Sequence, residues 1–185
     1  MIRIIGGSAR GTPLTAPRGR NTRPTLGRTR ESIFNVLANV GLVDTKVLDI
    51  FAGTGALGLE AVSRGAAEAV LIDQATGRIM QENAKRCRME DRVKILPKEA
   101  GKALRSLEGK EFDYIFMDPP YDRGYINEIL GLVIRLGLPA DHSIIIVEHV
   151  SAEPLELSPF GAALSVWKEK QVGETAVTHL LYTKI

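Results

Sequence analysis

Short apolar runs alternate with helix-like segments through most of the chain, and this alternation constrains the fold more than any other feature. Five runs predict buried strands, at residues 46–51, 68–73, 92–96, 112–117 and 143–150. The segments between them predict helices, at residues 56–64, 75–88, 100–107 and 125–136. Because apolar strands separated by helices form parallel sheets covered on both faces, we expect a doubly wound α/β domain.

The two ends of the chain differ from this repeating unit. Residues 26–40 have helical spacing, while residues 163–171 and 174–184 predict an antiparallel hairpin that turns at Val172-Gly173. We expect Trp167 and Tyr182 of the hairpin to be packing residues. The predicted organisation is a basic arm at residues 1–25 followed by one domain at residues 26–185.

Composition narrows the class of protein. The 185 residues are 44% hydrophobic and 25% charged, which is ordinary for one soluble domain. No apolar run approaches the roughly 20 residues of a membrane span, and residues 1–10 do not resemble a signal segment, so we expect a cytoplasmic protein. Cys87 is the sole cysteine, and the three histidines lack ligand spacing, so we expect no disulfide and no metal.

The net charge of +2 conceals an uneven distribution. Residues 1–30 contain seven arginines and no acidic residue, so they carry +7 and leave −5 for the rest of the chain. Arginine interleaved with Gly, Pro and Thr suits bidentate contact with phosphates, which predicts binding of nucleic acid. A solvated, partly flexible terminus is the alternative interpretation.

A glycine-rich loop follows the first predicted parallel strand. Gly53, Gly55 and Gly58 have the spacing G-x-G-x-x-G, which lets a backbone turn tightly and approach a ligand. Asp73, 20 residues beyond Gly53, ends the second strand, where a carboxylate can bind both hydroxyls of a ribose. The loop alone fits either a dinucleotide or S-adenosylmethionine, and a plain strand-to-helix turn would also use glycines.

Two further acidic residues bear on the choice of ligand. Asp49 lies just before the loop, where it would repel a pyrophosphate but could reach the ammonium of S-adenosylmethionine. It could also merely brace the loop. Glu99 follows the third strand and could accept a hydrogen bond from an adenine amine, although a helix start favours Glu in any case.

The fourth strand ends in Asp118-Pro119-Pro120-Tyr121, at the same edge of the sheet. An exocyclic amine on a base is a poor nucleophile because its lone pair is delocalised into the ring. The Asp118 carboxylate and the Pro119 carbonyl can each accept one N–H, which aims the lone pair at a methyl sulfonium about 3 Å away. The prolines fix the carbonyl, and Tyr121 can stack on a flipped-out base. A rigid turn explains the prolines but not the flanking acid and tyrosine.

Four stretches in order, "RIIGGSARG", "RPTLGRTRESIFN", "LDIFAGTGALGLEA" and "FMDPPY", resemble the RsmD family of bacterial methyltransferases, which act on the guanine N2 amine of 16S ribosomal RNA. The resemblance runs from Arg3 to the terminal hairpin. It implies a class I methyltransferase (Rossmann-like) fold with strand order 3-2-1-4-5-7-6, and S-adenosylmethionine as methyl donor with S-adenosylhomocysteine as product.

The resemblance also assigns site residues. The implied cofactor contacts are Asp49, Phe51, Ala52, Gly53, Thr54, Gly55, Asp73, Gln74, Glu99, Ala100 and Asp118, and the implied catalytic residues are Asp118, Pro119, Pro120 and Tyr121. The implied RNA contacts are Arg10, Arg23, Thr25, Arg28 and Arg30. Related enzymes often carry Asp or Asn where this chain has Glu99.

Other functions remain in competition with this one. The same chemistry could act on adenine N6 in DNA, although 185 residues leave no room for a target-recognition domain. A nicotinamide-dependent oxidoreductase would also use the glycine loop, whereas a non-catalytic RNA binder would not need residues 118–121. We expect 16S RNA as the partner, within a small-subunit assembly particle, and a monomeric enzyme that binds no membrane.

Overall fold

The computed structural model describes residues 1–17, 24–120 and 123–185, and within them the main sheet has seven strands. The strand order is β5-β4-β3-β6-β7-β9-β8, which is the order 3-2-1-4-5-7-6 expected from the sequence. The strands from β3 to β7 are parallel, and β9 runs antiparallel to both β7 and β8. Their bounds are β3 Lys46–Ile50, β4 Glu68–Ile72, β5 Val93–Leu96, β6 Phe112–Met117, β7 Pro139–Val150, β8 Leu164–Val172 and β9 Thr175–Tyr182.

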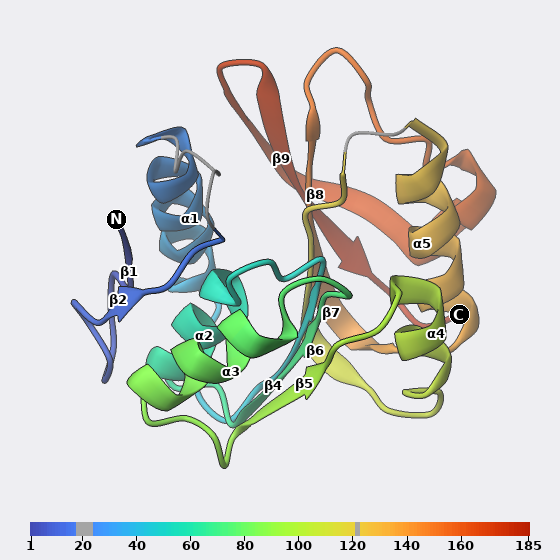
Figure 1. Ribbon diagram of the computed structural model, residues 1–185. Helices are drawn as coiled ribbons and strands as arrows, with labels where there is room; N and C mark the ends of the chain where they lie inside the picture. Colours follow the sequence, from blue (N-terminus) through green and yellow to red (C-terminus); the bar gives the residue numbers. More distant parts are fainter. Residues whose placement is uncertain (18–23, 121–122) are drawn as a thin grey trace.

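Helices cover both faces of this sheet, which confirms the doubly wound α/β fold. Figure 1 shows α1, α2 and α3 on one side and α4 and α5 on the other. Each side has its own apolar cluster, one joining α1–α3 to the sheet and the other joining α4 and α5 to it. The bounds are α1 Pro24–Leu37, α2 Ala56–Ser63, α3 Gly77–Arg86, α4 Ala100–Arg105 and α5 Arg123–Arg135, and a 3-10 helix, η1, spans Ser158–Ala163.

The register of the parallel strands brings five strand ends to one edge. Ile50 of β3 is level with Ile72 of β4 and with Met117 of β6, and Met117 is level with Val147 of β7. Leu96 ends β5 beside Ile72. The loops after β3, β4, β5 and β6 therefore begin side by side, next to the end of β7, which continues to Val150, as expected for ligand sites of this fold.

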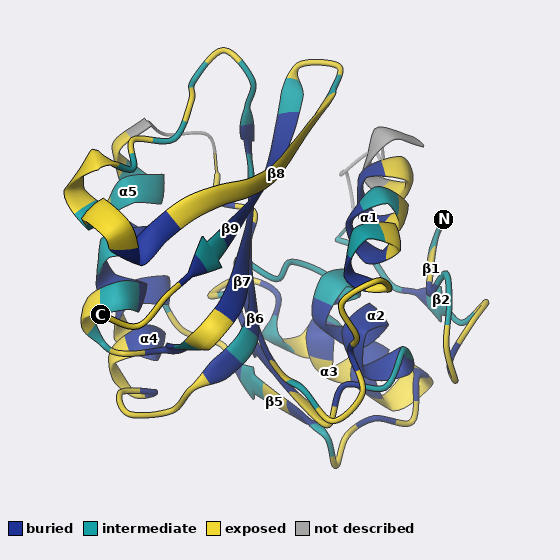
Figure 2. Ribbon diagram, turned by 180° about the vertical axis from the view of Figure 1, so that it is seen from behind, coloured by how far each residue is buried: buried dark blue, intermediate teal, exposed yellow. Residues whose placement is uncertain are grey.

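Some boundaries and elements differ from the predictions. Helix α1 ends at Leu37 rather than at residue 40, and β7 starts at Pro139 rather than at residue 143. Tyr182 packs in the core as predicted, whereas Trp167 is 46% exposed and contacts the His179 ring edge-on. Trp167 lies on the edge strand β8, most of which is exposed (Figure 2).

The N-terminal residues were predicted to form a basic arm, but the described part of them packs closely on the domain. Two short strands, β1 (Ile2–Arg3) and β2 (Pro13–Leu14), pair with each other. Ile4, Ala9 and Leu14 are buried in the same apolar cluster as α1, α2 and α3. Residues 1–17 are therefore part of the folded unit.

Two close contacts fasten this segment to the C-terminal end of α2. The Ser8 amide donates a hydrogen bond to the Ser63 carbonyl at 2.7 Å, and the Ser63 hydroxyl donates to the Gly6 carbonyl at 2.6 Å. Gly7 has φ of 78°, and a Cβ at this position would lie 1.8 Å from the Ser63 carbonyl oxygen. Only glycine fits there, because the backbones approach too closely for a side chain.

Glu60 of α2 is the centre of the same contact. Its side chain is fully buried and accepts hydrogen bonds from the amides of Ile5 and Gly6, at 2.8 and 2.7 Å. It also accepts from Arg64 at 2.8 Å and forms an ion pair with Arg30 at 3.7 Å. A buried carboxylate needs this many partners, since leaving it unpaired would be costly.

No helix in the described residues is long and apolar enough to cross a membrane.

The Gly7 contact gives a matched pair of substitutions. Gly7 and Gly11 both have positive φ, of 78° and 85°, but a Cβ at Gly11 would meet nothing within 4 Å. We expect Gly11→Ala to lower the free energy of unfolding by about 1–2 kcal/mol, the cost of a left-handed alanine. Gly7→Ala should lower it by at least about 3 kcal/mol, because the clash with Ser63 is added. Equal losses in urea denaturation would contradict the close contact.

Candidate functional site

The loop between β3 and α2 turns tightly, and its glycines permit this backbone conformation. Gly53 and Gly55 have positive φ, of 57° and 80°, and Phe51 has a φ of 65°, which is unusual for a residue with a side chain. The third glycine, Gly58, lies against β4, since a Cβ there would be 2.2 Å from a methyl of Leu71. The predicted roles of the glycines, a tight turn and a close approach of helix to sheet, match this geometry.

Asp49 lies beneath this loop and is 1% exposed. Its Oδ2 accepts a hydrogen bond from the Gly58 amide at 2.9 Å, and no described residue forms an ion pair with it. Burial, with smaller contributions from the nearby Asp118 and Asp73 carboxylates, raises the pKa of Asp49 to about 7 against the lowering effect of the Gly58 amide. A buried carboxylate with these surroundings would be stabilised by a cationic ligand group.

Asp73 follows β4 and orders the loop from the other side. Its Oδ2 accepts from the Gly53 amide at 3.0 Å, and its Oδ1 accepts from the amides of Ala75 and Thr76. Gln74, next in the chain, is exposed. The three amides hold the Asp73 carboxylate in one orientation, with lone pairs left for a ligand hydroxyl.

Asn83 of α3 is a site residue that sequence reasoning missed. It is fully buried, and its amide nitrogen donates to the carbonyls of Thr54 and Thr15, each at 2.9 Å. Its Oδ1 accepts from the Thr15 amide at 2.7 Å. The side chain thus joins the glycine loop to the N-terminal segment, a link that no short sequence motif reveals because its parts are far apart in the chain.

Aromatic and acidic side chains lie together near the glycine loop and the starts of α4 and α5. The rings of Phe51 and Tyr125 lie 5.5 Å apart. Glu99 caps α4, accepting from the amides of Gly101 and Lys102 at 2.8 and 3.1 Å, and these contacts, led by Gly101, lower its pKa. Glu99 also raises the pKa of Tyr125, after burial, so the two side chains are neighbours. Tyr125 was not predicted, because its place in α5 gave no sign of a ligand contact.

Glu99 therefore has the helix-start role that the sequence left open. Its two oxygens retain lone pairs that can face a ligand, and the contact with an adenine amine stays a prediction. Ala100, the first residue of α4, is buried behind it.

The segment that begins at Asp118 follows directly after β6, the fourth parallel strand in chain order. Asp118 is exposed, Pro119 is buried and Pro120 is exposed, while Tyr121 lies outside the described residues. Asp118 contributes to the raised pKa of both Asp49 and Glu148, so the three carboxylates are close. The structure brings Asp49, the acid next to the glycine loop, and Asp118, the candidate catalytic acid, to the same edge of the sheet.

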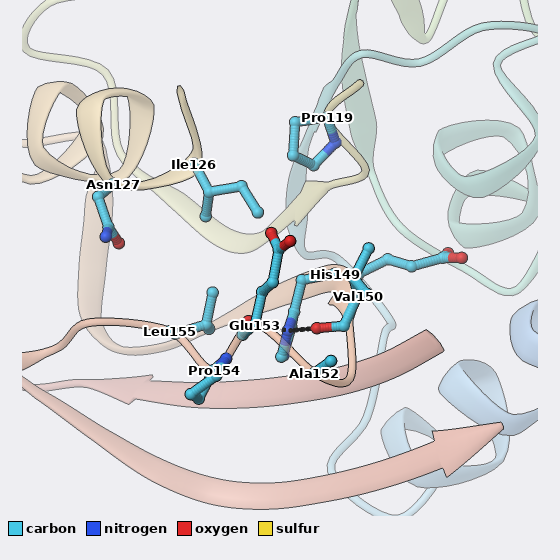
Figure 3. Close-up of a pocket in the computed structure, with 10 residues that line it drawn as sticks. Pro119, Ile126, Asn127, His149, Val150, Ala152, Glu153, Pro154 and Leu155 are labelled. Carbon is cyan, nitrogen blue, oxygen red and sulfur yellow. Dashed lines mark hydrogen bonds between the residues drawn. The ribbon is translucent and has the colours of Figure 1, made fainter. Parts of the chain in front are cut away.

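A cavity of about 270 Å³ adjoins Pro119. Figure 3 shows Ile126 and Asn127 of α5 on one wall, and the loop after β7, including Leu155, on another. Glu148 also borders it. The His149 ring holds this loop, with Nδ1 3.0 Å from the carbonyls of both Val150 and Glu153. His149 thus restrains the loop that forms one wall of the cavity beside Pro119.

The predicted RNA contacts are divided by the structure. Arg10 and Arg28 are exposed. Arg30 is 8% exposed and donates to the Arg3 carbonyl besides pairing with Glu60, so it holds the N-terminal segment. Arg23 and the side chain of Thr25 lie outside the described residues. RNA contact by all of these residues stays a prediction.

Within residues 1–17, 24–120 and 123–185, no group of three or more His, Cys, Asp or Glu side chains could hold a metal ion.

Comparison with known proteins points to one family. A family model described as "Conserved hypothetical protein 95" matches residues 2–181. Ribosomal RNA small subunit methyltransferase D of Escherichia coli (strain K12) is 40% identical over 177 residues, which cover 95% of this chain and 87% of that protein. YlbH of Bacillus subtilis, described as a candidate rRNA methyltransferase, is 33% identical over 80% of this chain and 82% of its own length.

A solved structure agrees with these relatives. The Escherichia coli protein yhhF, described as a candidate methyltransferase, superimposes with a TM-score of 0.87 at 38% identity, and 98% of each chain is covered.

The raised pKa of Asp49 predicts a dependence of stability on pH. The folded protein holds a proton on Asp49 up to about pH 7, whereas the unfolded chain releases it near pH 4. Stability from this group is therefore present at low pH and lost as the pH rises through this window. Relative to Asp49→Asn, wild-type free energy of unfolding should decline between pH 5 and 7 by up to about 1.4 kcal/mol per pH unit. If urea denaturation gives the same pH dependence of the unfolding free energy for wild type and Asp49→Asn, Asp49 does not hold a proton in the folded protein.

Proposed function

Because the chain belongs to the family described as conserved hypothetical protein 95, the RsmD family, we propose that it transfers a methyl group from S-adenosylmethionine to the N2 amine of a guanine in 16S ribosomal RNA. Family membership confirms the resemblance seen in the sequence, and relatives named as small-subunit rRNA methyltransferases support the reaction class. The observation that carries the proposal is the shared edge at which Asp49 and Asp118 interact.

The residues at this edge fit S-adenosylmethionine better than a dinucleotide. Asp49 is buried without an ion-pair partner among the described residues, which suits the ligand's ammonium. A pyrophosphate over the same loop would meet three carboxylates, Asp49, Asp73 and Asp118, and be repelled by each. The oriented Asp73 is suited to the ribose, and Phe51 with Tyr125 to the flat face of the adenine.

When bound, S-adenosylmethionine supplies an electrophilic methyl carbon, and its bond to sulfur breaks as the bond to N2 forms, with the electron pair left on sulfur. The chain's own groups prepare the amine. Asp118 and the Pro119 carbonyl accept its two N–H bonds and thereby favour a tetrahedral nitrogen with a directed lone pair. The proton lost from N2 after transfer passes to Asp118 or to water.

We extend the proposal to the partner and the setting. Exposed arginines at the N-terminal end, Arg10 and Arg28 among the described residues, would contact RNA phosphates. The substrate would be a small-subunit assembly particle in the cytoplasm, and the enzyme a monomer.

Asp118→Ala tests the catalytic assignment. We expect kcat to fall by about 10²–10⁴-fold, because the amine loses an acceptor that acts in the transition state. The variant should still show a rise in Tm with S-adenosylmethionine, since the cofactor loop is intact. Asp91→Ala, which alters an exposed acid elsewhere, is the control and should retain full turnover. Undiminished methylation by the Asp118 variant would refute the role of this carboxylate.

The substrate is identified by supplying methyl-labelled S-adenosylmethionine with under-modified small subunits, free 16S RNA and duplex DNA, followed by digestion to nucleosides. The proposal expects label in N2-methylguanosine. Label in N6-methyladenosine of DNA would favour the alternative, and a dinucleotide that raises Tm where S-adenosylmethionine does not would overturn methyl transfer.

Substitution of the exposed arginines tests RNA contact. Arg10→Ala and Arg28→Ala should each weaken RNA binding and reduce the slope of log K against log salt by about 0.7, the value for one phosphate contact in a single strand. Arg86→Ala is the matched control, because Arg86 is exposed but paired with Glu82 at 2.7 Å. An unchanged salt slope in filter binding for both test variants would remove these arginines from the interface.

A further inference from the structure

Glu148 stands beside Asp118 at the edge where the proposed reaction occurs. The parallel strands β6 and β7 are in register at Phe116 and Ile146, and again at Met117 and Val147. Asp118 and Glu148 are the next residues on each strand. Adjacent parallel strands are about 4.8 Å apart, so equivalent side chains on them are neighbours.

Both carboxylates belong to the α1 side of the sheet. Phe116 and Ile146, two residues earlier on each strand, are packed in the cluster that includes α1. Because side chains alternate along a strand, residues two positions on face the same way. Asp49 shares this face, since it follows Val47 of the same cluster and pairs with Phe116.

The surroundings of Glu148 do not satisfy its charge. It is half-buried, and no described residue hydrogen-bonds or forms an ion pair with its carboxylate. Burial, and then the Asp118 charge, raise the pKa of Glu148 to about 7. A carboxylate in this position is energetically costly, and none of the described residues offers it a partner that would explain it structurally.

The chemistry of guanine provides a partner. N2, the amine that receives the methyl group, is adjacent on the ring to N1, which carries a hydrogen and is a donor. If N2 is held by Asp118 and the Pro119 carbonyl, N1–H points to a neighbouring position at the same edge. Glu148 is the acidic neighbour of Asp118 on the α1 side of this edge, as the register of β6 with β7 requires.

We propose that Glu148 is a specificity-determining residue that accepts the N1–H of the target guanine while Asp118 and Pro119 hold its N2 amine. This inference rests on the proposed function. It explains selection of guanine: a base with an amine at the same position but a lone pair at N1 would face a carboxylate, and the two would repel each other.

The base 2,6-diaminopurine provides the test, because it keeps the N2 amine but has an acceptor at N1. Wild-type enzyme, Glu148→Gln and the control Glu111→Gln are compared on an RNA with guanine or 2,6-diaminopurine at the position identified by labelling. Glu111 is an exposed acid just before β6, at the opposite end of that strand from Asp118. The measured quantity is the ratio of kcat/KM for guanine to kcat/KM for 2,6-diaminopurine.

We expect the wild type and Glu111→Gln to prefer guanine strongly, and Glu148→Gln to lower the ratio by at least about tenfold. The reason is that a glutamine can turn its amide to donate to N1 of 2,6-diaminopurine, so activity on that base should rise as activity on guanine falls. An equal loss on both bases would mean a structural role and would overturn the inference.

A second measurement needs only the wild-type enzyme and so does not depend on folding of the variant. The ionised Glu148 accepts from guanine, whereas the protonated acid can donate to 2,6-diaminopurine. The ratio of kcat/KM values should therefore rise with pH through about 7. Asp118, which faces Glu148, and Asp49, which lies beyond it on β3, affect both substrates and largely cancel in the ratio.

A ratio independent of pH would overturn the inference while leaving guanine methylation intact. Absence of N2-methylguanosine with the wild type would instead refute the proposed function itself, so the two failures are distinguishable.

Discussion

The site depends on one constraint, the common direction of the five parallel strands from β3 to β7. Because they share a direction and a register, their carboxyl ends meet at one edge, and the residues that follow them are neighbours without being neighbours in sequence. Three acidic residues lie at these ends, and burial together with the Asp118 charge raises the pKa of both Asp49 and Glu148. A ligand that brings an ammonium and N–H donors stabilises the ionised carboxylates at this edge. This is the physical link between the fold and the proposed reaction.

The N-terminal segment also stabilises the site, through its contacts with the buried carboxylate of Glu60. Glu60 binds two backbone amides and two arginines. If α2 and residues 1–17 separated, the Glu60 carboxylate would lose hydrogen-bond partners in a buried position, which is costly. The start of α2 is the end of the glycine loop. Contacts that hold the helix therefore also hold the loop, which is how a segment far from the cofactor edge contributes to it.

The sequence predicted the fold and the strand-end residues because both follow from local patterns. Apolar strands, glycine spacing and the Asp118–Pro120 segment can each be recognised within about ten residues. The misses involve partners distant in sequence: Asn83 binds Thr15 and Thr54, and Glu60 binds Ile5 and Gly6. Charge alone could not reveal that Arg30 is 8% exposed, and its contact with RNA stays a prediction. Glu148 was passed over since its significance lies in the register of β6 with β7.

The Asn83 side chain has a practical consequence for work with this protein. Its amide is shared between Thr15 and Thr54, so deletion or a poorly placed affinity tag at the amino terminus would remove two of its three hydrogen bonds and leave only the third to restrain the glycine loop. An engineered truncation would then present as a weakened affinity for the methyl donor, and could be mistaken for damage to the catalytic edge.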